Sequence, residues 1–170
     1  MKIAFCKSSL PLSVLIRWGL QEPVSHAVFI FNDYFAVHSD LLGVHLTTID
    51  KIKKADTIVY TLNYALTPEE EFATLKRLLT SALGEPYDFG AFFYFIWRAL
   101  LKRVFGKPLP TKNLFQIDDM LMCTEVAGDL PANGVLATEI VNPLKTVDLG
   151  MTSPYQLYLF LAKLFPKEAP

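Results

Sequence analysis

The sequence predicts an α+β fold in a single domain, residues 1–170, with an antiparallel sheet or barrel packed against helices. Its 170 residues are 52% apolar, which is enough chain and enough apolar surface for one buried core. Short runs of β-branched and aromatic residues follow one early helical segment, and mostly helical patterns come after them. Strands and helices that are segregated along the chain in this way are typical of α+β proteins.

Several segments are predicted strands because β-branched and aromatic residues are dense in them. The pair Asn32 and Asp33 is a turn signal, so the strands on either side of it should form a hairpin. The predicted strands are residues 2–7, 25–31, 34–39, 43–49 and 56–63.

Capping and first-turn residues mark the predicted helices. Ser8 or Ser9 is expected to cap an early helix that carries Pro11 in its first turn. Thr67 is expected to cap a second helix, which Gly84 closes. The remaining predicted helices are an apolar helix over residues 90–106, a short helix within residues 120–134 and a C-terminal helix over residues 153–165.

Charge and cysteine content narrow the function classes. The chain has 16 basic and 17 acidic residues, so no excess of positive charge favours a nucleic-acid partner. Cys6 and Cys123 form no disulfide framework, and no Cys/His cluster has zinc-ligand spacing. We therefore expect free thiols, no metal and no cofactor. The N-terminal stretch lacks the pattern of a signal peptide, and the free thiols fit a reducing compartment, so we expect a cytoplasmic protein.

The apolar helix raises the question of a membrane. Its uninterrupted apolar part ends at Arg98, which is too short to span a bilayer. A buried helix is the simpler interpretation, and the alternative is an interfacial helix that directs Arg98, Lys102 and Arg103 toward lipid headgroups. Under this alternative the protein makes peripheral contact with a membrane. The oligomeric state stays open.

Cys123 is the candidate nucleophile. It lies in "MLMCTEVAG", directly before Thr124, where a short helix is expected to start. The dipole and free N–H groups of a helix start favour a thiolate and lower the thiol pKa, and they can also hold an oxyanion. The alternative is a buried structural cysteine, which is how we interpret Cys6 in its predicted strand.

The three histidines of the chain are the candidate bases. His26 opens one predicted strand and His38 lies in the next, so a hairpin would make them neighbours on one face of the sheet. A catalytic base and the group that orients it need this geometry. His45, in the following strand, is the alternative third member, and each histidine could instead be a hydrogen-bonded residue without a catalytic role.

Four segments follow one another along the chain: "VSHAVFIF", "FAVHS", "ALGEPYDFGAFF" and "MCTEVAG". Their order resembles that of the circularly permuted papain-like cysteine hydrolases, the YiiX-like branch of the NlpC-type peptidases. In unpermuted relatives the glycine–tyrosine segment and the cysteine helix come first, whereas here the histidine strands come first. The family's Gly-x-Pro-Tyr-x-Trp-Gly-Gly segment is matched by Gly84, Pro86, Tyr87 and Gly90, with Phe89 at the tryptophan position.

The resemblance implies a circularly permuted papain-like fold and a role for each matching residue. Cys123 would be the nucleophile and His26 the general base. His38 would be the third member, at a position where many permuted relatives carry glutamate. Tyr87 would line the site and assist the oxyanion, and Thr124 stands where the family has serine.

Three functions are open at this point. The leading hypothesis is a cysteine peptidase or amidase that cleaves an amide or related acyl bond, with cell-wall peptides as the family's best-known substrates. The expected partner is then a peptide or acyl small-molecule substrate, and the resemblance implies a bacterial or bacteriophage protein. The second is a lipid-directed thiol acyl hydrolase or acyltransferase, similar to the lecithin retinol acyltransferase-like enzymes. The third is a papain-like module that binds a peptide or lipid without turnover.

Overall fold

The computed structural model describes residues 1–64, 66–106, 120, 123–127 and 148–165. Its strands form one sheet in the order β4-β3-β2-β1-β5, and every neighbouring pair is antiparallel. The predicted α+β class, with an antiparallel sheet packed against helices, is therefore confirmed. The strands are β1 (Lys2–Ser8), β2 (His26–Ile30), β3 (Phe35–Asp40), β4 (Gly43–Thr48) and β5 (Asp56–Asn63).

Helices connect the strands and cover the sheet. Within the described part of the chain, no helix is long and apolar enough to cross a membrane. Residues 123–127 form a short helical segment. The other helical elements are α1 (Pro11–Leu20), α2 (Ile49–Ala55), α3 (Pro68–Arg77), the π-helical turn η1 (Leu78–Ala82), α4 (Phe89–Arg103), the 3-10 turn η2 (Leu149–Met151) and α7 (Pro154–Leu161).

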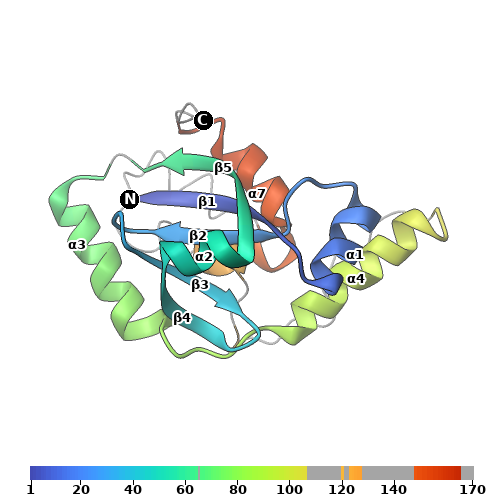
Figure 1. Cartoon of the computed structure of the whole chain (residues 1–170), viewed down its shortest axis with the longest axis horizontal. Helices are drawn as coiled ribbons and strands as arrows, with labels where there is room; N and C mark the ends of the chain where they lie inside the picture. Colours follow the sequence, from blue (N-terminus) through green and yellow to red (C-terminus); the bar gives the residue numbers. More distant parts are fainter. Residues whose placement is uncertain (65, 107–119, 121–122, 128–147, 166–170) are drawn as a thin grey trace.

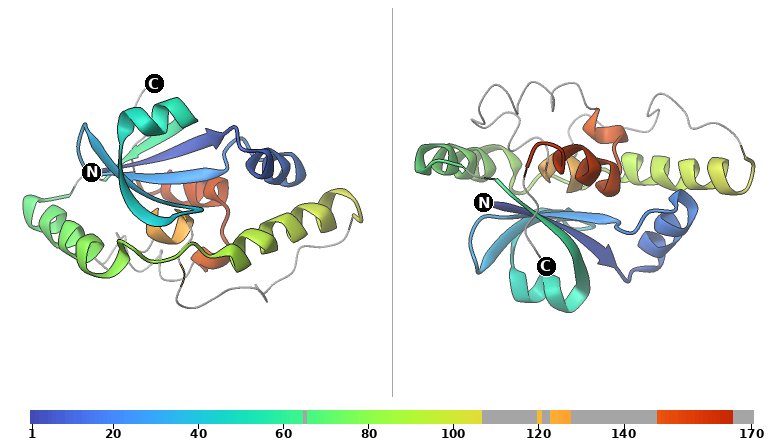
Figure 2. Two further views of the ribbon diagram at one scale, coloured as in Figure 1. Left: turned by 60° about the horizontal axis from the view of Figure 1, so that its bottom comes forward. Right: turned by 90° about the horizontal axis from the view of Figure 1, so that it is seen from above.

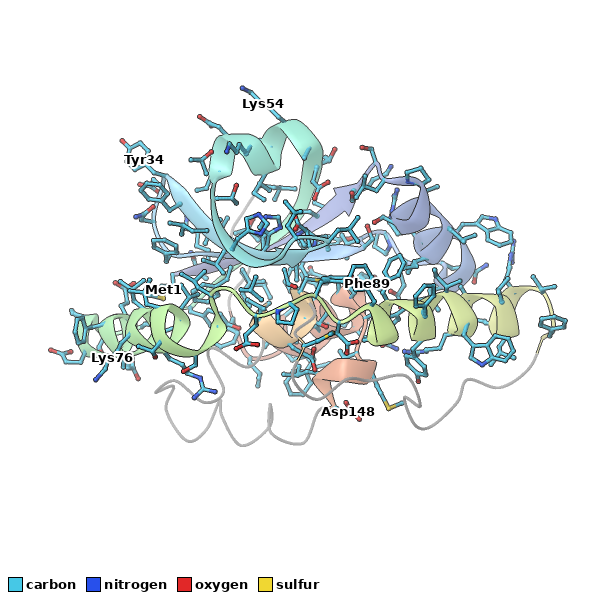
Figure 3. All side chains as sticks on the ribbon, turned by 90° about the horizontal axis from the view of Figure 1, so that it is seen from below. Met1, Tyr34, Lys54, Lys76, Phe89 and Asp148 are labelled. Carbon is cyan, nitrogen blue, oxygen red and sulfur yellow. The ribbon has the colours of Figure 1, made fainter. Side chains whose placement is uncertain are left out.

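The sheet is the middle layer of the molecule. One face carries α2, and the other faces α3, α7 and the helical segment 123–127 (Figures 1 and 2). Lys54 on α2 and Asp148 before η2 lie on opposite sides of the sheet in Figure 3. This arrangement gives the strands two buried faces.

Alternation along the strands fills both faces. Phe5 of β1 and Phe29 of β2 point toward α7 and are almost fully buried. Their neighbours Cys6 and Val28 point the other way and pack in the cluster that contains Ile52 of α2. Burying a large apolar side chain contributes about 1.5–3 kcal/mol, so these positions fix which face each strand residue takes.

The register collects polar strand ends at one end of the sheet. Ser8 at the end of β1 pairs with Asp56 at the start of β5. β2 begins at His26 and β3 finishes at Asp40 near the same end. The ladder between β2 and β3 contains only two residue pairs, both at the opposite end, so these strands separate toward His26. The sheet therefore opens where its polar residues gather.

Beyond this end of the sheet, α1 packs along α4 (Figure 1). Gly19 permits the contact, because a Cβ there would overlap the side chain of Ala99. Arg98 and Lys102, expected at lipid headgroups under the interfacial alternative, are engaged in the fold instead. Arg98 is buried and donates to the carbonyl of Met151 at 2.7 Å, and Lys102 donates to a carbonyl of α1 at 3.0 Å.

Several predicted element boundaries need correction. α1 has no serine cap: its N-cap is Leu10, and Ser8 belongs to β1 and accepts the N–H of Leu10 through its side chain. The apolar helix predicted over residues 90–106 begins at Phe89 and ends at Arg103. The C-terminal helix predicted over residues 153–165 has the expected Ser153 cap but ends at Leu161. The remainder of the helix expected within residues 120–134 lies largely outside the described residues.

A pair of glycines tests how the loop before α4 is held against β4. Gly43 has φ +92°, and a Cβ there would lie 2.5 Å from the backbone oxygen of Glu85. Gly84 has φ +90° but no atom within 4 Å of its Cβ position. We expect Gly43→Ala to lower the free energy of unfolding by about 2–4 kcal/mol, because it combines a strained φ with a backbone clash. The control Gly84→Ala should cost about 1 kcal/mol, from φ alone. Equal losses in urea unfolding would contradict this packing.

Candidate active site

His26 and His38 form a hydrogen-bonded pair at the open end of the sheet. Nε2 of His26 lies 2.9 Å from Nδ1 of His38, and the two rings meet edge to face with centroids 5.1 Å apart. The prediction that the hairpin makes these residues neighbours is confirmed. The bond uses one nitrogen of His26 and leaves its Nδ1 for a different partner, as a base with an orienting group requires.

Cys123 is buried, and it is the first described residue of the helical segment 123–127. The predicted helix start depends on residues 121 and 122, which lie outside the described part of the chain. Backbone N–H groups of Ala27 and Thr124 lie near the Cys123 sulfur and act to lower the pKa of the thiol. Ala27 follows His26 directly in β2, so the sulfur sits beside the strand that carries the candidate base. Thr124 is fully buried and its hydroxyl donates to the carbonyl of Leu149 at 3.2 Å, which anchors the helix start to η2.

The candidate residues line one cavity of about 430 Å³, which we call the strand-end cavity. Its wall includes Cys123, His26, His38 and Tyr87, contributed by segments far apart in the sequence. Apolar side chains of α1 and α4 complete one side, including Ile16, Phe92 and Phe95. A volume of this size accommodates a small organic group or one or two amino-acid side chains.

Burial decides the protonation of the candidate nucleophile and base. Burial lowers the pKa of His26 to about 4, and burial raises the pKa of Cys123 to about 11 although backbone N–H groups oppose the rise. The N–H group of Thr124 lowers the thiol pKa, as expected, but loss of solvation outweighs it, so the pKa of Cys123 is raised overall. The resting state of the site is therefore a neutral Cys123 thiol together with a neutral His26 imidazole.

Tyr87 lies on the wall of the cavity, held by the loop that leads into α4. Its ring packs edge to face against Phe89 at 5.3 Å and Phe92 at 6.3 Å. Burial is the main cause that raises the pKa of Tyr87, so its hydroxyl stays protonated and can donate a hydrogen bond. The next residue, Asp88, caps α4 by accepting the N–H of Ala91 at 2.9 Å, which fixes where the tyrosine lies.

His45 lies in this region but does not share the role of His38. It is directly opposite His38 in the β3–β4 ladder, with ring centroids 4.6 Å apart. Its Nδ1 lies 3.1 Å from the carbonyl oxygen of Gly43, and the hydrogen bond of His26 goes to His38. Of the two candidates for the third member, His38 is therefore the one placed to orient His26.

Sequence reasoning missed the carboxylates at the open end of the sheet. Asp40 and Asp56 both line the strand-end cavity, and Asp40 Oδ2 lies 3.9 Å from Nε2 of His38. Burial raises the pKa of Asp56, and its bond to Ser8 opposes the rise. A His-x-Asp spacing along β3 was the available signal for Asp40, because residues two apart in a strand share a face.

No protein-family model matches the chain, and no curated protein matches it significantly.

The raised pKa of Cys123 predicts the pH dependence of its alkylation. In a Cys6→Ala background, the rate of reaction with iodoacetamide should rise about tenfold per pH unit from pH 7 to 9, because thiolate increases with pH below the pKa. Alkylation at Cys123 is followed by mass spectrometry of the folded protein, with a small free thiol as control, which levels off near its own pKa of about 8.5. A plateau already near neutral pH would show a thiolate–imidazolium pair and contradict the neutral resting state.

Proposed function

We propose that this chain is a cysteine hydrolase of an amide or related acyl bond, with Cys123 as nucleophile, His26 as general base and His38 as the orienting residue. The observation that carries the proposal is that all three line the strand-end cavity while His26 is hydrogen-bonded to His38. A structural cysteine and two structural histidines have no need to face a common cavity. In the resting state, the Cys123 thiol and the His26 imidazole are both neutral. This state suits a base that accepts the thiol proton only when substrate arrives.

The hydrogen bond of the histidine pair assigns a direction to proton transfer. When His26 donates Nε2–H to Nδ1 of His38, its own Nδ1 is unprotonated and can accept the thiol proton. His38 then carries its proton on Nε2, the atom nearest Asp40. The groups that favour the thiolate of Cys123 are backbone N–H groups and not the His26 ring, so we expect sulfur and imidazole to approach each other when substrate enters.

The reaction follows from these positions. The sulfur attacks the substrate carbonyl as its proton passes to Nδ1 of His26, and an S–C bond forms while the carbonyl oxygen takes negative charge. The backbone N–H groups of Ala27 and Thr124, which act on the sulfur, and the hydroxyl of Tyr87 on the cavity wall are the donors that we propose for this oxygen. His26 gives its proton to the leaving amine or alcohol, and water then cleaves the thioester with His26 as base.

The fold that we propose with this chemistry is the circularly permuted papain-like fold. The order of elements supports it: the strand with His26 comes first, the loop with Tyr87 follows, and the helical segment with Cys123 comes last. The antiparallel sheet with the cysteine helix on one face is compatible with this arrangement.

Labelling with an activated acyl probe tests the proposal. The probe should acylate Cys123, and Cys123→Ala should abolish labelling, whereas the matched control Cys6→Ala should keep it, because Cys6 is buried on the opposite face of the sheet. His26→Ala should slow acylation about 10²–10⁴-fold through loss of the base. Mass spectrometry identifies the site. Labelling that persists in Cys123→Ala, or that is unchanged in His26→Ala, would refute the assignment.

A second substrate class, a lipid acyl group, is favoured by one surface. Phe89, Phe93 and Trp97 follow one another at helical spacing on α4 and are 43%, 59% and 44% exposed. At the end of α4, the guanidinium of Arg103 lies 5.4 Å from the ring centre of Trp18, a half-exposed residue of α1. Aromatic and basic groups side by side on a helix are typical of a surface that lies at a lipid interface.

Flotation with anionic liposomes tests this alternative. If lipid is the substrate source, the protein should float with the vesicles, and Phe93→Ser with Trp97→Ser should reduce recovery severalfold by removing exposed apolar area. Phe72→Ser on α3, where the side chain is 69% exposed, is the matched control and should float as the wild type does. No recovery of the wild type with vesicles would remove the lipid alternative and leave a soluble amide or ester as substrate.

A further inference from the structure

Three potential metal ligands meet on one face of the β3–β4 hairpin. His38 and Asp40 are two residues apart on β3, and His45 is directly opposite His38 on β4. One ligand atom from each lies within 4.8 Å of the other two. Oδ2 of Asp40 is 3.9 Å from Nε2 of His38, and Oδ1 is 3.6 Å from Nδ1 of His45. The pairing of two strands, rather than a loop, therefore brings the three side chains together.

The donor set suits a divalent transition metal. Two imidazole nitrogens and one carboxylate oxygen match the preference of Zn²⁺ and its neighbours, and they leave a fourth position for water. Ligand bonds near 2.1 Å in a tetrahedral site place ligand atoms about 3.4 Å apart. The separations above exceed this by a few tenths of an ångström to about 1.4 Å, a gap that rotation of the half-exposed Asp40 and His45 side chains can close.

His38 has a hydrogen-bond partner that prepares it as a ligand, because its Nδ1 is bonded to His26 while its Nε2 is the atom near Asp40. A ligating histidine commonly uses its second ring nitrogen in this way, which fixes the ring. Nδ1 of His45, the atom 3.6 Å from Asp40, lies 3.1 Å from the carbonyl of Gly43 and would exchange that contact for the metal. Access comes from solvent, because the side chains of His45 and Asp40 are 34% and 37% exposed, whereas that of His38 is 9% exposed.

We propose that His38, Asp40 and His45 form a site for a divalent transition metal such as Zn²⁺, and that its occupation switches off His26 as a base. The first part stands on the geometry of the hairpin alone. The second part rests on the proposed thiol hydrolase function, because it concerns the proton that His26 must accept.

The coupling follows from the two tautomers of the histidine pair. A metal on Nε2 of His38 requires the proton of that ring to be on Nδ1. His38 then donates to Nε2 of His26, so the single proton of neutral His26 is on Nδ1, the nitrogen that must be free to accept the thiol proton. A second proton on His26 would lie on Nε2, where its N–H group would face the Nδ1–H group of His38 with no acceptor between them. Metal binding and acylation of Cys123 are therefore mutually exclusive.

Metal binding itself is tested without catalysis. Isothermal titration of Zn²⁺ into the full chain carrying Cys6→Ala and Cys123→Ala, which removes both thiols, should give one equivalent of binding. His45→Gln and Asp40→Asn in that background should each weaken affinity at least tenfold. Asp33→Asn, an exposed carboxylate in the β2–β3 turn, is the control and should bind as its parent does. Absence of binding, or equal affinity in all variants, overturns the site, and circular dichroism verifies that each variant is folded.

The coupling is tested by acyl-probe labelling in the Cys6→Ala background. Zn²⁺ should suppress acylation of Cys123 at concentrations that fill the site, and His45→Gln should restore labelling in the presence of Zn²⁺, since His45 lies outside the proposed catalytic group. Nitrogen NMR of the thiol-free protein should show the His26 proton moving to Nδ1 on zinc addition. Suppression that persists in His45→Gln indicates direct binding of zinc to the thiol and overturns the coupling. If the wild type shows no labelling without metal, the proposed function fails while the titration still decides the site.

Discussion

The pairing of β1 with β2 on one side and with β5 on the other is the constraint on which the rest of the structure depends. Ile3 and Phe5 bury toward α7, and Ala4 and Cys6 bury toward α2, so β1 cannot shift by one residue without exposing one of two cores. The same register sets His26 opposite Cys6 at the open end of the sheet. The candidate site residues gather at that open end of the sheet. Their positions therefore depend on the packing of β1 between the two cores.

Burial at the candidate site has two opposite effects on reactivity. It holds Cys123 and His26 in their neutral forms, so the thiol is weakly nucleophilic until a substrate alters the cavity. It also removes water from the N–H groups of Ala27 and Thr124, which strengthens their interaction with a developing oxyanion. The His26–His38 bond connects this buried chemistry to the more exposed Asp40 and His45. The position of the single proton in that bond can therefore couple a change at Asp40 and His45 to the ability of His26 to accept the thiol proton.

Sequence patterns predicted the elements that depend on residues close together in the chain. The hairpin that joins His26 to His38 was predictable because a turn signal and strand alternation lie within a few residues of each other. α2 was not predicted, because its seven residues are mostly polar and its place depends on packing of Ile52 against β1 and β2. Cys123 and the strand that carries His26 are far apart in the chain, so local patterns could not place them together and only the resemblance paired Cys123 with His26. The high pKa of the thiol could not be foreseen, because burial depends on the assembled fold.

The central claim is that Cys123 and His26 act together across the strand-end cavity. The most direct measurement is a crystal structure of the protein after reaction with an acyl probe whose thioester is slow to hydrolyse. The account predicts an acyl group bonded to the Cys123 sulfur within the cavity, its carbonyl oxygen near the N–H groups of Ala27 and Thr124, and Nδ1 of His26 facing the sulfur. An acyl group bonded elsewhere, or a His26 ring turned away from Cys123 in the adduct, would contradict it.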